Sequence, residues 1–258
     1  MDLGIAGRKA IVCASSRGLG FACAKALAQA GCEVIINGRN HGQLEKAAAA
    51  LKTSGARIIP VVADVASADG QKALFAACPE PDILINNNAG PPFRDFRELD
   101  RQKMLDGVIA NMVVAVELIQ KVIDPMVARK FGRIVNITSG SVKMPIAGLD
   151  LSSGARAGLT AFLAGVARSV AAANVTINSV LPGSFDTDRL RSNMEMTAKK
   201  KNISVEAASK ERMNTVPAKR FGQPDELGAA CAFLCSAQAG YITGQSLLID
   251  GGVFPGAF

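Results

Sequence analysis

Tryptophan is absent from this chain of 258 residues, and tyrosine and histidine occur once each. Aromatic side chains that could stack on bases are therefore scarce, and the basic residues behind the net charge of +7 are scattered, so no nucleic-acid partner is expected. The chain also lacks any apolar run near the roughly 18 residues that cross a membrane, and it lacks the basic and apolar regions of a signal peptide. These absences predict a cytoplasmic protein with no membrane partner.

The cysteines show no pattern typical of a metal site or of a secreted, disulfide-linked domain. All six lie in apolar surroundings, and none has histidine at zinc-like spacing. They are Cys13, Cys23, Cys32, Cys78, Cys231 and Cys235. We expect them to be small packing residues and predict no bound metal.

The remaining composition predicts one α/β domain over residues 1–258. Hydrophobic residues make up 49% and charged residues 20%, which is typical of globular proteins. Seven short apolar runs are candidate strands: 9–13, 34–36, 58–62, 83–85, 134–137, 175–181 and 246–249. Continuous apolar runs indicate strands buried on both faces, and helical patterns separate them. We therefore predict a Rossmann-type, doubly wound, mostly parallel sheet of seven strands with helices on both faces.

The first candidate strand leads into a turn of small residues, 14–20, and then into a helical pattern. A strand, a glycine-containing turn and a helix N-terminus together present backbone N–H groups to a phosphate. Gly18 and Gly20 fit that fingerprint, whereas Cys23 stands where a third glycine is usual. The alternative is a tight strand-to-helix connection that binds nothing.

Several further segments follow in a recognisable order. They are Asp64-Val65 after the third candidate strand, Asn86-Asn87-Asn88-Ala89-Gly90 after the fourth, Asn111 on the next helix, Ser139 after the fifth strand, and Pro182-Gly183 with Thr187 after the sixth. Together with the turn Cys13–Gly20, they resemble motifs of the short-chain dehydrogenase/reductase family over essentially the whole chain. The extra asparagine in the Asn-Asn-Ala-Gly motif leaves its register open.

The resemblance implies a nicotinamide dinucleotide site and a catalytic group. The implied cofactor-binding residues are Ser15, Ser16, Arg17, Gly18, Leu19, Gly20, Arg39, Asn40, Asp64, Val65, Asn87, Asn88, Ala89, Gly90, Arg156, Pro182, Gly183 and Thr187. The implied catalytic positions are Asn111, Ser139, Ser152 and Arg156.

The last two catalytic positions depart from the family pattern. The family has Tyr-x-x-x-Lys at the register where this chain has Ser152 and Arg156. The arginine keeps the positive charge, but the serine hydroxyl is a far weaker acid than a phenol. Loss of general acid catalysis typically costs ~10²–10⁴-fold in rate. Tyr241 precedes the last candidate strand, and by register it is not a substitute.

The end of the second candidate strand indicates which dinucleotide binds. An NAD site usually has a carboxylate there for the ribose 2′-hydroxyl, whereas this chain has Gly38 followed by Arg39 and Asn40. Arg17 adds a second cation in the phosphate turn. These residues favour NADP(H) over NAD(H).

Three functions remain open from the sequence. The first is an NADP(H)-dependent oxidoreductase acting on a hydroxyl/carbonyl pair by an atypical proton route. In it, Ser139 polarises the carbonyl, Arg156 holds the ribose, Asn111 orders water and Ser152 at most positions water. The second is a catalytically weak or inactive nucleotide-binding subunit or sensor. The third is a non-redox lyase or hydratase using the same pocket.

Two further predictions concern the substrate and the assembly. The long, irregular-looking segment at about 183–217 follows a strand end and is expected to cover a small-molecule substrate. Its basic residues (Arg189, Arg191 and 199–201) favour an anionic substrate. The helical patterns at 100–123 and 152–173 are apolar or small over more than one face, which favours a homo-oligomer, a dimer or tetramer.

Overall fold

A parallel sheet of seven strands forms the centre of the computed structural model, which describes residues 2–90 and 93–256. The strand order is β3-β2-β1-β4-β5-β6-β7, and each neighbouring pair runs parallel. The strands are β1 (Lys9–Val12), β2 (Glu33–Gly38), β3 (Ile58–Val62), β4 (Ile83–Asn86), β5 (Gly132–Ile137), β6 (Val175–Pro182) and β7 (Ser246–Ile249). All seven predicted strands are confirmed, and so is the doubly wound fold.

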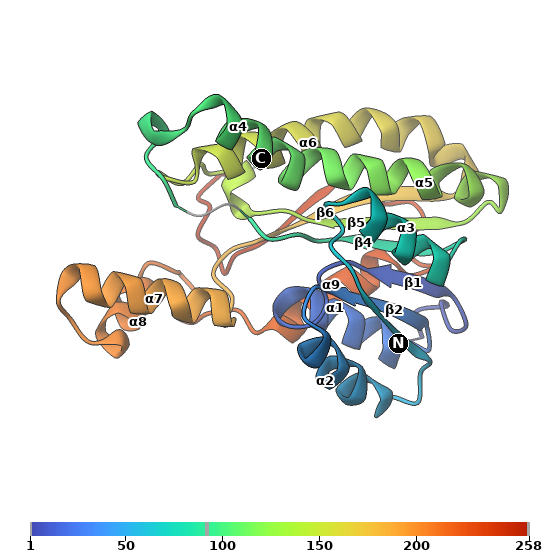
Figure 1. Cartoon of the computed structure of the whole chain (residues 1–258), viewed down its shortest axis with the longest axis horizontal. Helices are drawn as coiled ribbons and strands as arrows, with labels where there is room; N and C mark the ends of the chain where they lie inside the picture. Colours follow the sequence, from blue (N-terminus) through green and yellow to red (C-terminus); the bar gives the residue numbers. More distant parts are fainter. Residues whose placement is uncertain (1, 91–92, 257–258) are drawn as a thin grey trace.

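Helices cover both faces of this sheet (Figure 1). On one face lie α1 (Gly18–Gln29), α2 (His41–Lys52) and α9 (Pro224–Leu234), and on the other lie α3 (Ala68–Ala77), α5 (Val114–Ala128) and α6 (Asp150–Val170). Successive residues of a strand pack into opposite layers. Val34 and Ile36 join the core under α1 and α2, whereas Ile35 joins the core under α5 and α6. This arrangement explains why the strands are apolar without alternation.

The helix predicted at 100–123 is interrupted by one wider turn. Here α4 (Arg101–Val108) runs into a π-helical turn, Ile109–Val113, and continues as α5. A π turn inserts one residue into the helix and often occurs at functional sites. In this chain it carries Asn111, whose side chain donates to the carbonyl of Gly107 at 2.9 Å.

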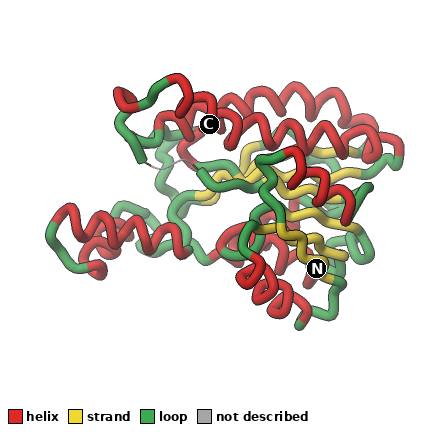
Figure 2. The backbone as a smooth tube through the Cα atoms, in the orientation of Figure 1, coloured by secondary structure: helices red, strands yellow, loops and turns green. Residues whose placement is uncertain are grey.

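The segment at about 183–217 is helical, and the expectation of an irregular segment is wrong. It forms α7 (Asp188–Lys201) and α8 (Val205–Asn214), which pack on each other and extend to one side of the sheet (Figure 2). Thr187 and Ser204 cap the two helices through bonds from the amides of Leu190 and Ala207. The sequence obscures both helices because few of their residues are apolar and buried, namely Met194, Ala198 and Ala208.

The cysteines behave as predicted. All six are buried and free, and none is in a disulfide. Burial raises the pKa of the Cys13 thiol to about 12, so this thiol is uncharged at neutral pH. Among the described residues, no helix combines the length and apolarity that crossing a membrane requires.

Candidate active site

The turn after β1 is held by hydrogen bonds from two neighbouring strands. The Ser15 hydroxyl donates to the carbonyl of Val12 at 2.7 Å and accepts from the amide of Asn37 at 3.0 Å. The Asn37 side chain accepts from the amide of Ala14, and the Asn87 side chain donates to the carbonyl of Ala14 at 3.2 Å. The turn is thus fixed before any ligand binds. Sequence reasoning missed Asn37, although a polar residue inside an apolar strand is the signal that marks it.

The turn is also narrow enough to cradle a phosphate. Gly18 and Ala14 have positive φ values of 60° and 45°, and the latter is a left-handed conformation that favours glycine, at a cost to alanine of about 1 kcal/mol. A Cβ on Gly20 would lie 2.5 Å from the carbonyl oxygen of Ala14. Within the described residues, the N-cap residue Arg17 makes no side-chain hydrogen bond to the first turn of α1, so the N–H groups of that turn are available to an anion. The residues fit a dinucleotide pyrophosphate.

The ends of β2 and β3 meet where the coenzyme's 2′-substituent is expected. The Arg39 guanidinium lies 3.8 Å from the Asp64 carboxylate, and both side chains are exposed. A Cβ on Gly38 would lie 3.1 Å from the Ser16 side chain. Two predicted cofactor residues have other roles for their side chains. Asn40 caps α2 by accepting from the amide of Gln43, and Val65 is buried in the core.

The three consecutive asparagines at the end of β4 and in the loop after it each make a different contact. Asn86 ends the strand, and its side chain donates to the Asn136 side chain at 2.9 Å inside the sheet. Asn87 holds the phosphate turn, and Asn88 donates to the carbonyl of Ala110 at 3.1 Å in the π turn. Asn87 to Gly90 therefore form the loop, and they connect the two halves of the predicted site.

Ser152 and Arg156 lie on one face of α6, as their spacing of four residues requires. The Arg156 guanidinium donates through Nε to the Ser152 hydroxyl at 3.2 Å and through a terminal nitrogen to the carbonyl of Ile137 at 3.0 Å. Burial and, to a lesser extent, the positive charge of Arg189 together lower the pKa of Arg156 to about 10. Arg156 therefore remains charged at neutral pH.

Ser139 follows β5 by two residues, close to the Ile137 carbonyl that Arg156 binds. Its hydroxyl accepts from the amide of Ser141 at 3.1 Å and caps the short 3₁₀ turn Gly140–Val142. The residue is only partly buried, so its hydroxyl can also reach a ligand. Further along the same edge, Thr187 caps α7, and a Cβ on Gly183 would lie 2.7 Å from Asp250, at the end of β7. Pro182 ends β6 beside it.

Two cavities adjoin these residues. The larger holds about 260 Å³ and is lined by residues from the loops, α4, the π turn and α6, among them Gly90, Leu99, Asn111, Leu149, Leu151 and Ser152. The smaller holds about 20 Å³ and is lined in part by Asn86, Asn111 and Arg156. That volume suits one water molecule. The Oδ1 atoms of Asn86 and Asn111 are buried and have no hydrogen-bond donor within the described residues.

Nearby carboxylates are engaged elsewhere. Asp188 pairs with Arg17 at 3.7 Å and with Arg191 at 3.4 Å, and Asp186 pairs with Arg191 at 3.0 Å. Asp150, the first residue of α6, accepts from the amide of Gly148. The part of the larger cavity that is described contains one carboxylate, Asp106, which accepts from the Gln102 side chain at 2.8 Å.

Comparison with known proteins identifies the class. Residues 13–254 match the family model described as Enoyl-(Acyl carrier protein) reductase, and the chain belongs to the short-chain dehydrogenase/reductase family. Its curated relatives include the NADPH-dependent reductase BacG of Bacillus subtilis, 32% identical over 95% of this chain and 97% of the relative. Another is the 3-oxoacyl-(acyl-carrier-protein) reductase FabG of Vibrio harveyi, 32% identical over 98% of this chain and 99% of the relative.

Solved structures of reductases also match this chain over nearly its whole length. The L-sorbose reductase from Gluconobacter frateurii, complexed with NADPH and L-sorbose, matches with a TM-score of 0.94 at 28% identity, over 99% of this chain and 100% of that one. YwfH, an NADPH-dependent reductase involved in bacilysin biosynthesis, matches with a TM-score of 0.91 at 29% identity, over 97% and 100%. The resemblance found in the sequence motifs is thus confirmed at the level of family and fold.

Proposed function

We propose that this protein is an NADPH-dependent reductase of a small carbonyl compound that delivers the proton through Ser152 and water instead of a phenol. Two of the proteins named above, BacG and YwfH, are described as NADPH-dependent reductases, and the L-sorbose reductase was solved with NADPH. The narrow turn at Ala14 to Gly20 and the cation Arg39 suit that coenzyme. When bound, NADPH supplies the hydride.

The observation that carries the proposal is the contact between Arg156 and Ser152. A buried guanidinium donates to the Ser152 hydroxyl at 3.2 Å, and that serine lines the larger cavity beside Asn111. A hydroxyl that accepts from a cation directs its own proton outward, here toward the cavity. Ser152 can therefore hold a water molecule that protonates the developing alkoxide, and Ser139 can donate to the same oxygen.

Arg156 and Asn111 act as positioning residues in this route. Arg156 keeps Ser152 oriented and supplies positive charge that stabilises an oxyanion. The Oδ1 atoms of Asn86 and Asn111, which have no hydrogen-bond partner among the described residues, favour a water in the smaller cavity, next to Arg156.

We expect Ser152→Ala to lower kcat about 100-fold and to leave the Kd for NADPH unchanged, because the hydroxyl positions the proton but does not hold the coenzyme. Stopped-flow loss of NADPH absorbance, with the solvent deuterium isotope effect on kcat, measures both the rate and the proton step. Ser153→Ala is the matched control: its hydroxyl donates to the carbonyl of Leu149 and lines neither cavity. Turnover of Ser152→Ala at the wild-type rate would contradict the proposed route.

The hypothesis of an inactive nucleotide-binding subunit makes the opposite prediction when a series of carbonyl compounds is tested for reduction by NADPH. If the wild-type protein binds NADPH but reduces nothing, while Ser152→Tyr with Arg156→Lys gains turnover, the chain is a nucleotide-binding subunit that has lost its catalytic acid. Product formation without loss of NADPH absorbance would instead support a lyase or hydratase.

We expect Arg39→Gln to raise the Kd for NADPH about 10- to 100-fold, because one charge-assisted contact to the 2′-phosphate is removed. The Kd for NADH should change less than twofold, since NADH has no 2′-phosphate, and it serves as the internal control. Fluorescence titration with both coenzymes measures the ratio. If the affinities for NADPH and NADH fell equally, Arg39 would contact the adenine or stabilise the fold instead of binding the 2′-phosphate.

We also propose that the chain forms a homo-oligomer through α4 and α6. Met104, Leu105 and Ile109 on α4 and its π turn, and Phe162 on α6, are large apolar residues that are exposed in the single chain. Sedimentation equilibrium gives the assembly mass directly, and a monomer at micromolar concentration would contradict this proposal.

A further inference from the structure

Arg94 brings a cation to the larger cavity that no carboxylate of the described chain neutralises. Its exposed side chain lines the cavity and makes no hydrogen bond or ion pair within the described residues. The other lining cation, Lys103, pairs with Asp100. The single carboxylate of the described lining, Asp106, accepts from the Gln102 side chain and forms no ion pair with Arg94. The guanidinium donors of Arg94 are therefore left to solvent or to a ligand of the cavity.

The backbone of Arg94 is fixed beside the segment that leads into α6. Its amide donates to the carbonyl of Gly148 at 2.9 Å, and the Phe93 ring lies 3.4 Å from the point where a Cβ on Gly148 would be. Gly148 has a φ of 78°, a left-handed conformation that favours glycine. The two loops are thus joined at a position four residues before Ser152, and Arg94 has a defined place at the mouth of the cavity.

An apolar wall separates Arg94 from the catalytic end of the cavity. Leu149 and Leu151 stand between Gly148 and Ser152 in the sequence, and both line the cavity. The start of α6 packs closely on α4 (Figure 1), since a Cβ on Gly107 would lie 2.3 Å from the Leu151 side chain. The cavity therefore has a cation in one loop, a hydroxyl on α6, and leucine side chains between them.

We propose that Arg94 binds a carboxylate of the substrate while the substrate's carbonyl group lies at Ser152. A guanidinium binds a carboxylate with two parallel, charge-assisted hydrogen bonds, which the fixed backbone of Arg94 helps to orient. The cavity of about 260 Å³ suits a small acid, and its leucines suit the carbon chain between the two groups. The inference rests on the proposed function and adds the substrate class: a carbonyl compound that carries a carboxylate, with carbon atoms between the two groups.

This site is separate from the coenzyme site. Arg94 belongs to none of the motifs that resemble the family's coenzyme-binding segments. A change at Arg94 should therefore affect the binding of the acid and leave the binding of the coenzyme as it is. That difference allows the substrate site to be tested without disturbing the phosphate turn.

The binding test uses levulinate, a small keto acid, and measures its binding by calorimetry to the protein saturated with NADP⁺, which cannot reduce it. We expect levulinate to bind the wild type, and Arg94→Met to weaken this binding about 10- to 100-fold with the Kd for NADP⁺ unchanged. Arg94→Lys should fall between the two, because it keeps the charge but loses the paired hydrogen bonds. Arg97→Met is the matched control, because Arg97 is in the same loop, pairs with Asp95 at 3.2 Å and does not line the cavity.

Two binding results would overturn the inference. One is no binding of levulinate to the wild-type complex with NADP⁺. The other is an Arg94→Met protein that binds levulinate as tightly as the wild type does. If NADP⁺ itself does not bind, the proposed function fails, and titration of levulinate into the free protein still decides whether Arg94 binds a carboxylate.

A pair of substrates separates the two proposals during turnover. Methyl levulinate has the same carbon skeleton as levulinate but carries no charge. We expect kcat/KM to favour levulinate about 10- to 100-fold in the wild type and in Arg97→Met, and to lose that preference in Arg94→Met. Reduction of both compounds at equal kcat/KM by the wild type would overturn the carboxylate site and leave the proposed reductase intact. Binding of levulinate that depends on Arg94, without reduction of either compound, would support the site and contradict the proposed reductase.

Discussion

Alanine in place of Gly20 is expected to weaken NADPH binding at least about 100-fold, or about 2.7 kcal/mol. The new Cβ would lie 2.5 Å from the carbonyl oxygen of Ala14 and 2.8 Å from the amide nitrogen of the Asn87 side chain. The carbonyl belongs to the backbone and cannot rotate away, so the turn itself must shift. Since a phosphate there depends on several N–H groups pointing at one position, a small shift removes most of the binding energy.

The measurement is fluorescence titration of NADPH, combined with thermal unfolding to show that the variant is folded. Gly165→Ala is the matched control. It lies in α6, a Cβ there would meet nothing within 4 Å, and alanine is favoured over glycine inside a helix by about 1 kcal/mol. We expect it to bind NADPH as the wild type does. A folded Gly20→Ala protein with the wild-type Kd would show that the turn after β1 does not hold the phosphates.

The central fold could be predicted because its strands are buried on both faces. Val34 to Ile36 and Val175 to Leu181 are buried at every position, and each range leads into a polar or glycine-containing segment at the same edge of the sheet. The family motifs follow the ends of these strands, so the topology of the sheet determines where they lie. Ser152 and Arg156 meet because helical geometry brings residues four apart onto one face.

Other parts of the site depend on contacts that sequence spacing does not reveal. Asn37 holds the phosphate turn only because β2 ends beside β1. Arg189 lies beside Gly90 because α7 begins immediately after Thr187, and no periodicity marks the start of that polar helix. Asn86 and Asn87 are identical in type and adjacent, but one bonds inside the sheet and the other bonds the turn.

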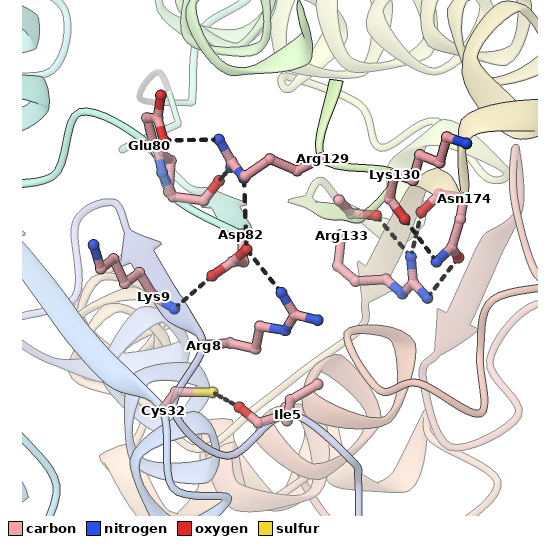
Figure 3. A network of polar contacts seen from close by, with 12 residues as sticks. Ile5, Arg8, Lys9, Cys32, Glu80, Asp82, Arg129, Lys130, Arg133 and Asn174 are labelled. Atoms are coloured by element: carbon pink, nitrogen blue, oxygen red, sulfur yellow. Dashed lines mark hydrogen bonds and ion pairs between the residues drawn. The ribbon is translucent and has the colours of Figure 1, made fainter. Parts of the chain in front are cut away.

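A second buried arginine, Arg133, stabilises the end of the sheet that lies away from the turn after β1. Arg133, the second residue of β5, has a fully buried side chain, 1% exposed, and its guanidinium donates to the carbonyls of Gly132, Asn174 and Ser236 at 2.8–3.0 Å. It also donates to the Asn174 side chain and lies 4.5 Å from the centre of the Phe131 ring. Figure 3 shows this group next to the Asp82 carboxylate, which accepts from the Arg8 guanidinium and the backbone amide of Lys9 and pairs with Arg129. One side chain thus ties the starts of β5 and β6 to the chain after α9.

We expect Arg133→Met to lower the free energy of unfolding by about 3 kcal/mol, and the melting temperature by about 6–12 °C. Methionine fills much of the volume but leaves the carbonyl of the buried Ser236 without its Arg133 donor, and a buried acceptor without a partner costs about 1–3 kcal/mol. The Asn174 carbonyl loses the guanidinium and keeps the amide of Gly132 at 3.3 Å. Urea unfolding followed by circular dichroism measures the change. Arg57→Met is the control, because that arginine is exposed and pairs with Glu33 at 3.3 Å, a contact worth about 1 kcal/mol or less. The Kd for NADPH should stay at its wild-type value in both variants, since Arg133 lies at the end of the sheet away from the phosphate turn; a stability loss no greater than that of Arg57→Met would show that the buried guanidinium does not hold this edge together.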